Sequence, residues 1–295
     1  MIKADWDITD RPQTRLKLDI LGKYLQAWAI IIGGHFREAY YIDCFAGRGK
    51  YHLNDQSDIV NGSPLIALDI AKRIQDAKKK KGKDFRMKIT AIDSDSQNIS
   101  ELKGFMGALN VNSGVEIKYI ESEFGTALPS IINETSGKPA FFFIDPYGVK
   151  GVTKESLDLI AARRGSTEIL YNYMRMGVQR VAGHKDNIAN QDEKIRARAI
   201  KTVSHLNELF GDTSWADKDE ADKLRHFVEQ VLGNNYKCVL NLNVPYPSRG
   251  GTLYNLLFAT NYDVGEKIMK DIIQKKLFEG TLFEKCPFDI DLKLK

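Results

Sequence analysis

Apolar and polar positions follow two different rhythms along this chain, and these rhythms predict most of its helices and strands. Between residues 14 and 33, apolar side chains such as Leu21, Leu25 and Trp28 recur at the spacing of one helix face, and Gly33-Gly34 should end this helix. Similar patterns predict further helices at 64–80, 96–110 and 263–277. Short apolar runs predict strands at about 38–44, 87–93, 115–120, 140–145 and 168–173.

Strands that alternate with helices are typical of a parallel, doubly wound sheet. Two later apolar runs, 236–244 and 253–260, are joined by a loop rich in Pro, Gly and polar residues, which favours an antiparallel hairpin. We therefore expect the α/β class, with a Rossmann-like, seven-stranded, mostly parallel sheet that ends in an antiparallel C-terminal hairpin. The polar segment 50–63 is expected to be a loop.

The change of pattern along the chain divides it into four expected parts. Residues 174–235 are polar and charged, with helical stretches and no strand signal, so they should form a helical insert that chooses the substrate. The four parts are an N-terminal helical segment at 1–37, an α/β core at 38–173, the insert at 174–235, and a hairpin and helix at 236–295 that complete the core.

Composition says more about the cellular location and partners of the protein than about its fold. The 295 residues are 43% hydrophobic and 28% charged, which is ordinary for a globular protein, and no apolar run approaches the length of a membrane span. Three cysteines without a C-x-x-C pair predict neither a disulfide framework nor a zinc site, and the histidines show no metal spacing. We expect a cytoplasmic protein without a metal. Its net charge of +4 is compatible with a nucleic-acid partner.

The phrase from Tyr40 to Gly49, YYIDCFAGRG, combines a buried strand, a terminal acid and a glycine loop. Two glycines one residue apart let the backbone approach a ligand closely. Asp43, at the carboxyl end of the strand, is placed to hold a polar or cationic group in the crevice above the sheet. Neither the dinucleotide fingerprint nor a P-loop is present. The alternative is a structural turn with a surface acid.

This D-x-F-A-G-x-G phrase resembles motif I of the class I S-adenosylmethionine (SAM) methyltransferases. The resemblance implies that the acid and the loop hold the methionine end of the cofactor. Asp43 would accept from the ammonium group, and loop N–H groups would meet the carboxylate at a helix start. The residues so implied are Asp43, Phe45, Ala46, Gly47 and Gly49.

Two later strand ends supply further candidates for the cofactor. Asp93, followed by Ser94, can accept from both ribose hydroxyls; alternatively, Ser94, Asp95 or Ser96 caps the next helix. The resemblance to the methyltransferases implies that adenine is held after the third strand, where Phe124 would stack and Glu123 would accept from the amino group. An ordinary charged loop is the alternative at this point.

The phrase Asp145-Pro146-Tyr147-Gly148 repeats the pattern of strand, terminal acid and tight turn. It resembles the [DNS]-P-P-[FY] phrase of methyltransferases that act on amino groups of bases, and more closely the D-P-F-G phrase of tRNA guanine-N2 methyltransferases. The resemblance implies that Asp145 and Pro146 accept hydrogen bonds from an exocyclic amino group and that Tyr147 stacks on the base. Adenine N6 and guanine N2 both stay open, and a Pro-Gly turn is the structural alternative.

Most of the chain resembles the family of three-Cys-motif partner proteins. The matching phrases are Tyr41–Gly49, Asn61–Leu68 and Phe143–Gly148. The resemblance implies a methyltransferase-like fold and a separate partner protein that bears three cysteines. Within Gly62-Ser63-Pro64, Ser63 belongs either to a second loop on the cofactor side or to a simple helix cap.

Four residues are candidates for contact with the substrate. Arg175 and Arg180 follow the fifth strand, where they would meet phosphates, while Tyr173 and Tyr246 would stack on bases. Packing and solubility account for these residues equally well.

Together these patterns predict a SAM-dependent methyltransferase that modifies an exocyclic amino group of a base in RNA or DNA. Two alternatives are a methyltransferase of a small molecule or protein, and a non-catalytic partner protein that has kept the fold. The prediction requires Asp43 and Asp145 to share one cleft.

Overall fold

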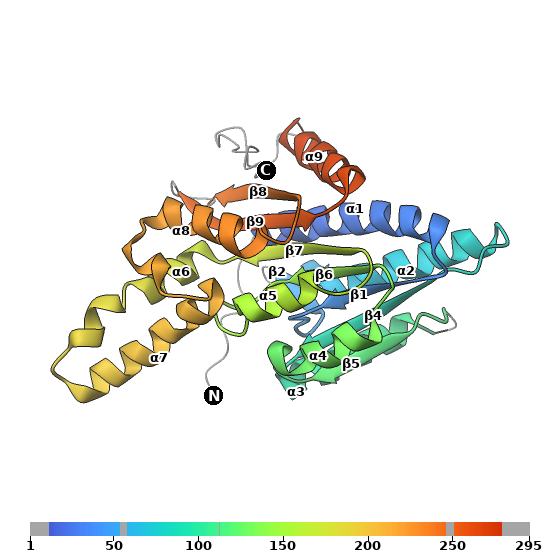
Figure 1. Cartoon of the computed structure of the whole chain (residues 1–295). Helices are drawn as coiled ribbons and strands as arrows, with labels where there is room; N and C mark the ends of the chain where they lie inside the picture. Colours follow the sequence, from blue (N-terminus) through green and yellow to red (C-terminus); the bar gives the residue numbers. More distant parts are fainter. Residues whose placement is uncertain (1–11, 54–57, 112, 246–250, 279–295) are drawn as a thin grey trace.

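A seven-stranded sheet organises the molecule, in a computed structural model that describes residues 12–53, 58–111, 113–245 and 251–278 (Figure 1). The strand order is β5-β4-β1-β6-β7-β9-β8, and all neighbours are parallel up to β7, whereas β9 runs antiparallel to both β7 and β8. The strands are β1 (Glu38–Asp43), β4 (Arg86–Asp93), β5 (Ile117–Glu121), β6 (Ala140–Ile144), β7 (Thr167–Tyr173), β8 (Cys238–Pro245) and β9 (Thr252–Thr260). The expected α/β class and antiparallel terminal hairpin are confirmed.

The order of the strands reverses direction between β1 and β6. From β1 the chain steps outward to β4 and β5, and then returns to the other side of β1 to add β6 and β7. In open α/β sheets, the helices that follow strands on either side of such a point diverge and leave a crevice at the carboxyl ends. We therefore expect a ligand to bind at the edge of the sheet where β1 and β6 end.

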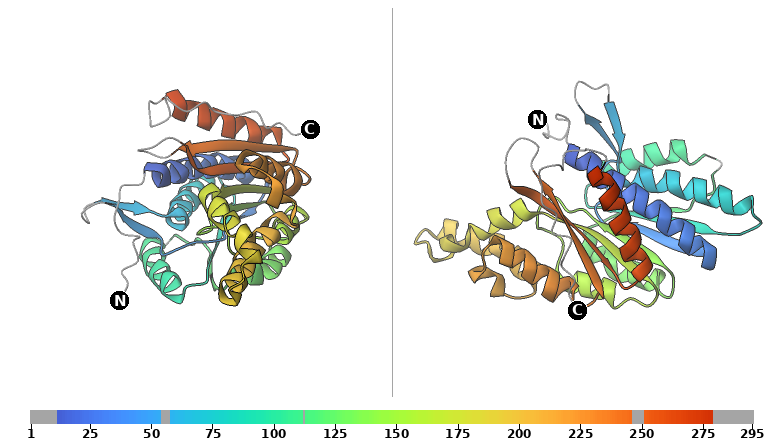
Figure 2. Two further views of the ribbon diagram at one scale, coloured as in Figure 1. Left: turned by 90° about the vertical axis from the view of Figure 1, so that its left-hand side faces the viewer. Right: turned by 90° about the horizontal axis from the view of Figure 1, so that it is seen from above.

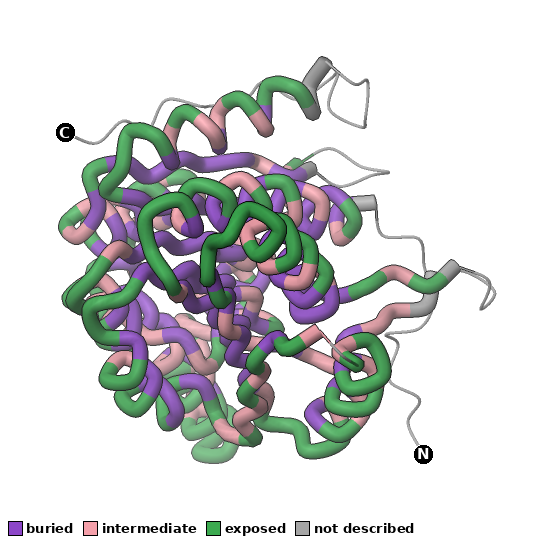
Figure 3. Tube along the Cα trace, turned by 90° about the vertical axis from the view of Figure 1, so that its right-hand side faces the viewer, coloured by how far each residue is buried: buried purple, intermediate pink, exposed green. Residues whose placement is uncertain are grey.

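Helices cover both faces of the sheet, as the views in Figure 2 show. Apolar side chains of α1 (Pro12–His35), α2 (Ser63–Lys79), α3 (Ser96–Leu109) and α9 (Asp263–Phe278) form one core cluster with one face of the strands. On the other face, α4 (Phe124–Glu134) and α5 (Lys154–Ala161) contribute to a second cluster. Figure 3 shows the same layering, with buried residues concentrated inside and exposed residues on the outer helical turns.

The segment 174–235 is helical, as expected, and it packs on the second face of the sheet. Its elements are α6 (Arg175–Ala182), η1 (Lys185–Ala189), α7 (Glu193–Phe210), η2 (Ser214–Asp217), α8 (Glu220–His226) and the π-helix η3 (Phe227–Leu232). Phe210, Trp215 and Phe227 from this segment are buried in the same cluster as Tyr171 and Tyr173 of β7. The insert therefore shares its core with the sheet.

Segment 50–63 is not the loop that its polar composition predicted. The strands β2 (Lys50–Leu53) and β3 (Asp58–Asn61) pair antiparallel as a separate two-stranded sheet. Each strand has only four residues, so the alternation of side chains was too short to stand out from a loop. Helices α4 and α5 were also missed, because α4 carries Pro129 in its interior and α5 spans only eight residues. No helix in the described ranges is long and apolar enough to cross a membrane.

Candidate functional site

The structure brings Asp43 and Asp145 to one edge of the sheet. Strands β1 and β6 are hydrogen-bonded neighbours, with Asp43 opposite Phe143, and Asp145 follows directly after β6. The charge of Asp145 reaches Asp43 strongly enough to raise the pKa of its carboxyl. The two acids that the sequence singled out therefore lie together at the point where the strand order reverses.

Asp43 is fully buried, and only one of its carboxyl oxygens has a partner. The Tyr41 hydroxyl donates to Oδ2 at 2.9 Å, whereas Oδ1 has no hydrogen-bond partner. Burial raises the pKa of Asp43 to about 7 and the charge of Asp145 adds to the rise, whereas the Ser63 and Tyr41 hydroxyls and the Phe45 N–H oppose it. A buried acceptor without a donor is rare and destabilising, so a group that brings a donor or a positive charge to Oδ1 would be favoured.

The glycine loop after β1 is held tightly against its surroundings. Gly47 and Gly49 have φ of 61° and 88°, and a Cβ on Gly49 would lie 2.6 Å from a methyl carbon of Leu102. The Ala46 N–H donates to the carbonyl of Ile92 in β4 at 2.8 Å. The loop can therefore adopt this path only with glycine at these positions.

The chain does not pass directly from this loop into a helix. The β2–β3 hairpin intervenes, and α2 starts at Ser63 with Gly62 in the capping position and no side-chain cap. The Gly62 N–H donates to the Gly49 carbonyl at 2.6 Å, so the hairpin closes on itself and returns the chain to the site. Ser63 is not a helix cap, and its buried hydroxyl faces Asp43.

Asp93 ends β4 and is already occupied by protein donors. Its Oδ2 accepts from the Gly47 N–H at 2.8 Å, and its Oδ1 accepts from the Asp95 N–H and from the Asn98 amide. The cap of α3 comes from Asp95, as one sequence alternative had it, and Ser94 is exposed beside it. Asp93 therefore anchors the glycine loop, and one lone pair, on Oδ2, is left for a ribose hydroxyl.

The candidates after β5 separate into one exposed and one buried residue. Glu123 is exposed at the start of α4, and its carboxylate lies 3.8 Å from Lys150 Nζ. Phe124 is the first residue of α4 and is buried, with its ring centroid 5.5 Å from that of half-buried Phe45. Phe124 presents no open face for stacking; it supports Phe45, which is the ring nearer to the glycine loop.

Asp145 has two partners, and sequence reasoning did not assign one of them, Lys17, to the site. Lys17 of α1 forms an ion pair with Oδ2, and the Asn172 amide of β7 donates to Oδ1 at 2.6 Å. Both partners are buried, and Asn172 Oδ1 has no hydrogen-bond partner of its own. A signal was available for Lys17, since it stands four residues before Leu21 on the apolar stripe of the expected helix.

The turn after Asp145 exposes an aromatic ring. Pro146 is buried, whereas Tyr147 is 77% exposed, the highest value among the large hydrophobic side chains described. Gly148 follows with φ of 92°, and a guanidinium nitrogen of Arg180 lies 4.0 Å from the position of a Cβ on this glycine. The turn thus places Tyr147 and the exposed Arg180 on the same rim.

The remaining substrate candidates lie elsewhere. Tyr173 is a correction, because its ring is 1% exposed and packs on Phe227 at 5.0 Å between ring centroids, so it cannot stack on a base. Alternation along β7 explains this, since Asn172 faces α1 and its neighbours face the second cluster. Arg175 is engaged in an ion pair with Glu220. Tyr246 lies outside the described residues.

Tyr51 of the β2–β3 hairpin was missed altogether. Its hydroxyl lies 2.9 Å from the position that a Cβ on Gly47 would occupy. Burial and then the charges of Asp145, Asp43 and Asp93 raise the pKa of Tyr51, which places the phenol among all three strand-end acids. No sequence signal marked it, because the segment was expected to be a loop.

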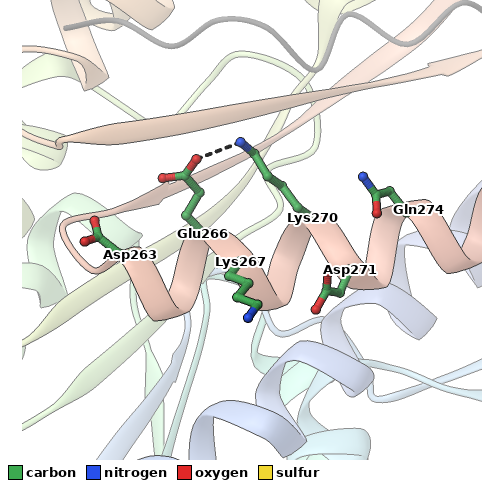
Figure 4. Close-up of a pocket in the computed structure, with 6 residues that line it drawn as sticks. All are labelled: Asp263, Glu266, Lys267, Lys270, Asp271 and Gln274. Carbon is green, nitrogen blue, oxygen red and sulfur yellow. Dashed lines mark hydrogen bonds and ion pairs between the residues drawn. The ribbon is translucent and has the colours of Figure 1, made fainter.

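A surface hollow elsewhere has no part in this site. It measures about 310 Å³ and is lined by one side of α9, with the Glu266 carboxylate 2.7 Å from Lys270 Nζ (Figure 4). None of the strand-end acids borders it.

Comparisons with known proteins give only weak structural similarities. No protein-family model matches the sequence, and a search of curated proteins found no match. A solved structure from Legionella pneumophila aligns with a TM-score of 0.44 and 12% identity, over 88% of this chain and 91% of its own. An O-methyltransferase from Bacillus cereus, in complex with SAH, aligns with a TM-score of 0.40 and 14% identity, over 81% and 80% of the two chains. At these similarities the assignment of function depends on the site itself.

Proposed function

We propose that this chain is a SAM-dependent methyltransferase. The observation that carries the proposal is the buried Asp43 Oδ1, which lacks a partner beside a glycine loop at the reversal of the strand order. A ligand with an ammonium group would satisfy this oxygen and favour the ionised carboxylate, because an opposite charge at contact offsets the penalty of burial.

The residues around Asp43 fit the rest of such a cofactor. Ser63 faces the same carboxylate, and the loop of Ala46, Gly47 and Gly49 follows directly after Asp43. Asp93 fixes the loop through Gly47 and keeps one lone pair, on Oδ2, for a ribose hydroxyl. Phe45, supported by Phe124, is the aromatic surface nearest to the loop on the side of α4.

Asp145, Pro146 and Tyr147 would orient the acceptor. When bound, SAM supplies an electrophilic methyl sulfonium, so the protein needs to position the acceptor more than to activate it. An amino group next to Asp145 would donate its N–H groups to the carboxylate. These hydrogen bonds would orient the nitrogen so that its lone pair faces the methyl group. Tyr147, exposed on the rim, offers a face for a planar base, and its removal should weaken acceptor binding.

We further propose that the acceptor is a base in RNA or DNA. The support is the rim itself, where the Arg180 guanidinium lies near Gly148 and the exposed ring of Tyr147 belongs to the residue before that glycine, together with the net charge of +4. Adenine N6 and guanine N2 are both compatible with an acceptor carboxylate. A separate partner protein with three cysteines, implied by the family resemblance, remains an expectation.

Two measurements test the proposal. Calorimetry should show that the chain binds SAM, and Asp43→Asn should abolish that binding while Asp69→Asn, an acid on the exposed side of α2, should not. Transfer of a labelled methyl group should then be measured with tRNA, rRNA, DNA, protein and small-molecule fractions.

The outcomes separate the alternatives. Label in a nucleic-acid fraction supports the full proposal. Label in protein or in a small molecule would show that the acceptor belongs to that class and is not a base in RNA or DNA. Binding without transfer to any fraction favours a non-catalytic partner protein. A chain that does not bind SAM is not a methyltransferase of this kind.

A further inference from the structure

Lys17 is the buried cation at the edge where β1 and β6 end. It belongs to α1, it is 8% exposed, and its ammonium forms an ion pair with Asp145 Oδ2. Its Nζ also lies 5.7 Å from the centre of the Tyr254 ring of β9. A long lysine side chain rarely gives up its hydration unless the partner is well placed, so this contact is a built feature of the fold.

Two hydrogen bonds fix α1 on either side of Lys17. Toward the amino end, the Tyr254 hydroxyl donates to the Gln13 carbonyl at 2.6 Å. Toward the carboxyl end, the Tyr24 hydroxyl donates to the buried Glu168 carboxylate at 3.0 Å. The helix therefore cannot slide along the sheet without breaking buried bonds, and Lys17 is held in register with the end of β6.

Asn172 completes the arrangement from β7. Its amide donates to Asp145 Oδ1 at 2.6 Å, so each oxygen of the carboxylate accepts from a different element. This fixes both the position of Asp145 and the plane of its carboxyl group. The protein therefore sets the direction of the remaining lone pairs of the Asp145 carboxylate before any ligand binds. This is the condition for electrostatic preorganisation.

We propose that Lys17 is a positioning residue of the reaction site: it fixes Asp145 and neutralises its charge, so that Asp145 can accept from the acceptor amine without over-stabilising the positively charged methyl donor. The inference rests on the proposed function. Methyl transfer moves the positive charge from the sulfur of the donor to the acceptor nitrogen, which then loses a proton. Before transfer, a bare Asp145 carboxylate would attract the donor cation as well as accept from the acceptor amine. Lys17 offsets that attraction and leaves the hydrogen-bonding capacity of Asp145 intact.

The affinity ratio of SAM to its uncharged product, S-adenosylhomocysteine, reports this charge balance directly and needs no acceptor. Lys17→Met leaves Asp145 uncompensated and should raise the preference for SAM about tenfold, as expected for charges a few ångströms apart in a partly screened site. Asp145→Asn leaves Lys17 uncompensated and should lower the preference by about the same factor. The double variant should return close to the wild-type ratio, as should Lys17→Arg.

Lys23→Met is the matched control, because Lys23 lies on the exposed side of the same helix and pairs with Asp19 at 3.5 Å. It should leave the ratio unchanged. The charged and titratable groups facing Asp145 are Lys17 from α1, Asp43 from β1, Tyr51 from β2 and Tyr254 from β9, so all binding is measured at one pH.

The results are decisive in each direction. Wild-type protein that binds neither ligand overturns the proposed function, and the inference with it. Wild-type protein that binds both, with the same ratio in Lys17→Met and Lys23→Met, overturns the inference alone. Should Lys17→Met not fold, Asp145→Asn and the double variant decide, because the predicted fall and recovery of the ratio need no uncompensated carboxylate.

Discussion

Asp43 and Asp145 end neighbouring strands of one sheet, and their surroundings are opposite. Asp43 is completely buried and has one oxygen without a partner, and burial raises its pKa to about 7. Asp145 is half-buried, and both of its oxygens are engaged, one by Lys17 and one by Asn172. Asp43 thus has an oxygen free to accept from a bound cation, whereas Asp145 is already paired with the Lys17 ammonium.

This difference assigns the two acids to different tasks. A carboxylate that lacks a counter-charge contributes most to binding a charged ligand, because contact recovers the energy lost on burial. A carboxylate that is already neutralised and fixed contributes orientation, because its geometry does not have to be arranged by the ligand. We therefore expect Asp43 to govern cofactor affinity and Asp145 to govern the acceptor.

The largest predicted effect tests whether Asp43 and Asp145 contribute differently to ligand affinity. Asp43→Asn should weaken SAM and S-adenosylhomocysteine alike, by about a thousandfold or about 4 kcal/mol, because both carry the ammonium group. Asp145→Asn should weaken SAM only about tenfold and its product less. Calorimetry at pH 8 measures both, and equal losses for the two variants would contradict the assignment.

The next effect compares the turns that follow the two acids. Gly49→Ala should destabilise the protein by about 3 kcal/mol, from positive φ and a collision with Leu102. Gly148→Ala has the same φ problem but meets only an Arg180 nitrogen at 4.0 Å, so it should cost about 1 kcal/mol. Urea denaturation of both variants gives the difference. A larger loss at Gly148 would show that the second turn is the tighter one.

A smaller effect comes from pH, and its sign follows from the raised pKa of Asp43. The folded protein keeps a proton on this carboxyl up to about pH 7, whereas the unfolded chain releases it near the ordinary value of 3.8. Stability of the unliganded protein should therefore fall as the pH rises from 4 to 7, by about 1.4 kcal/mol for each pH unit. SAM affinity should rise over the same range, because binding needs the ionised form.

The control for this prediction is Asp43→Asn, which should lose that component of the pH dependence. Free energies of unfolding at pH 5 and pH 8 for both proteins provide the comparison. An identical pH dependence in the variant would assign the titration to another group.

The smallest effect concerns two buried tyrosine hydroxyls. Tyr41→Phe removes the donor to Asp43 Oδ2 and should destabilise the protein by about 1.5 kcal/mol. Tyr173→Phe removes a buried hydroxyl that has no partner, so stability should be unchanged or slightly higher. Thermal denaturation distinguishes the two. A loss for Tyr173→Phe as large as that for Tyr41→Phe would mean that this hydroxyl has a partner in solution.

Sequence patterns predicted helices and strands correctly where apolar side chains repeat over a long enough segment. The strands of the main sheet and the long helices lie within a few residues of their expected bounds, because burial on one or both faces imposes a clear period. The β2–β3 hairpin and the short helices α4 and α5 gave no such period. Tyr173 was assigned to the substrate because sequence order after a strand does not show which face a side chain takes when both faces are buried.

Taken by itself, the sequence determined that the acids of β1 and β6 would close parallel strands, and that glycine would allow the backbone to turn after each. Those are local properties, governed by hydrophobic period and by the freedom of φ at glycine. Only the tertiary structure decided which acid stays unpaired. Lys17 lies 128 residues from Asp145 along the chain, and Asn172 lies 27 away. Their contact depends on how α1 and β7 pack against the sheet, and burial and charge compensation follow from that packing.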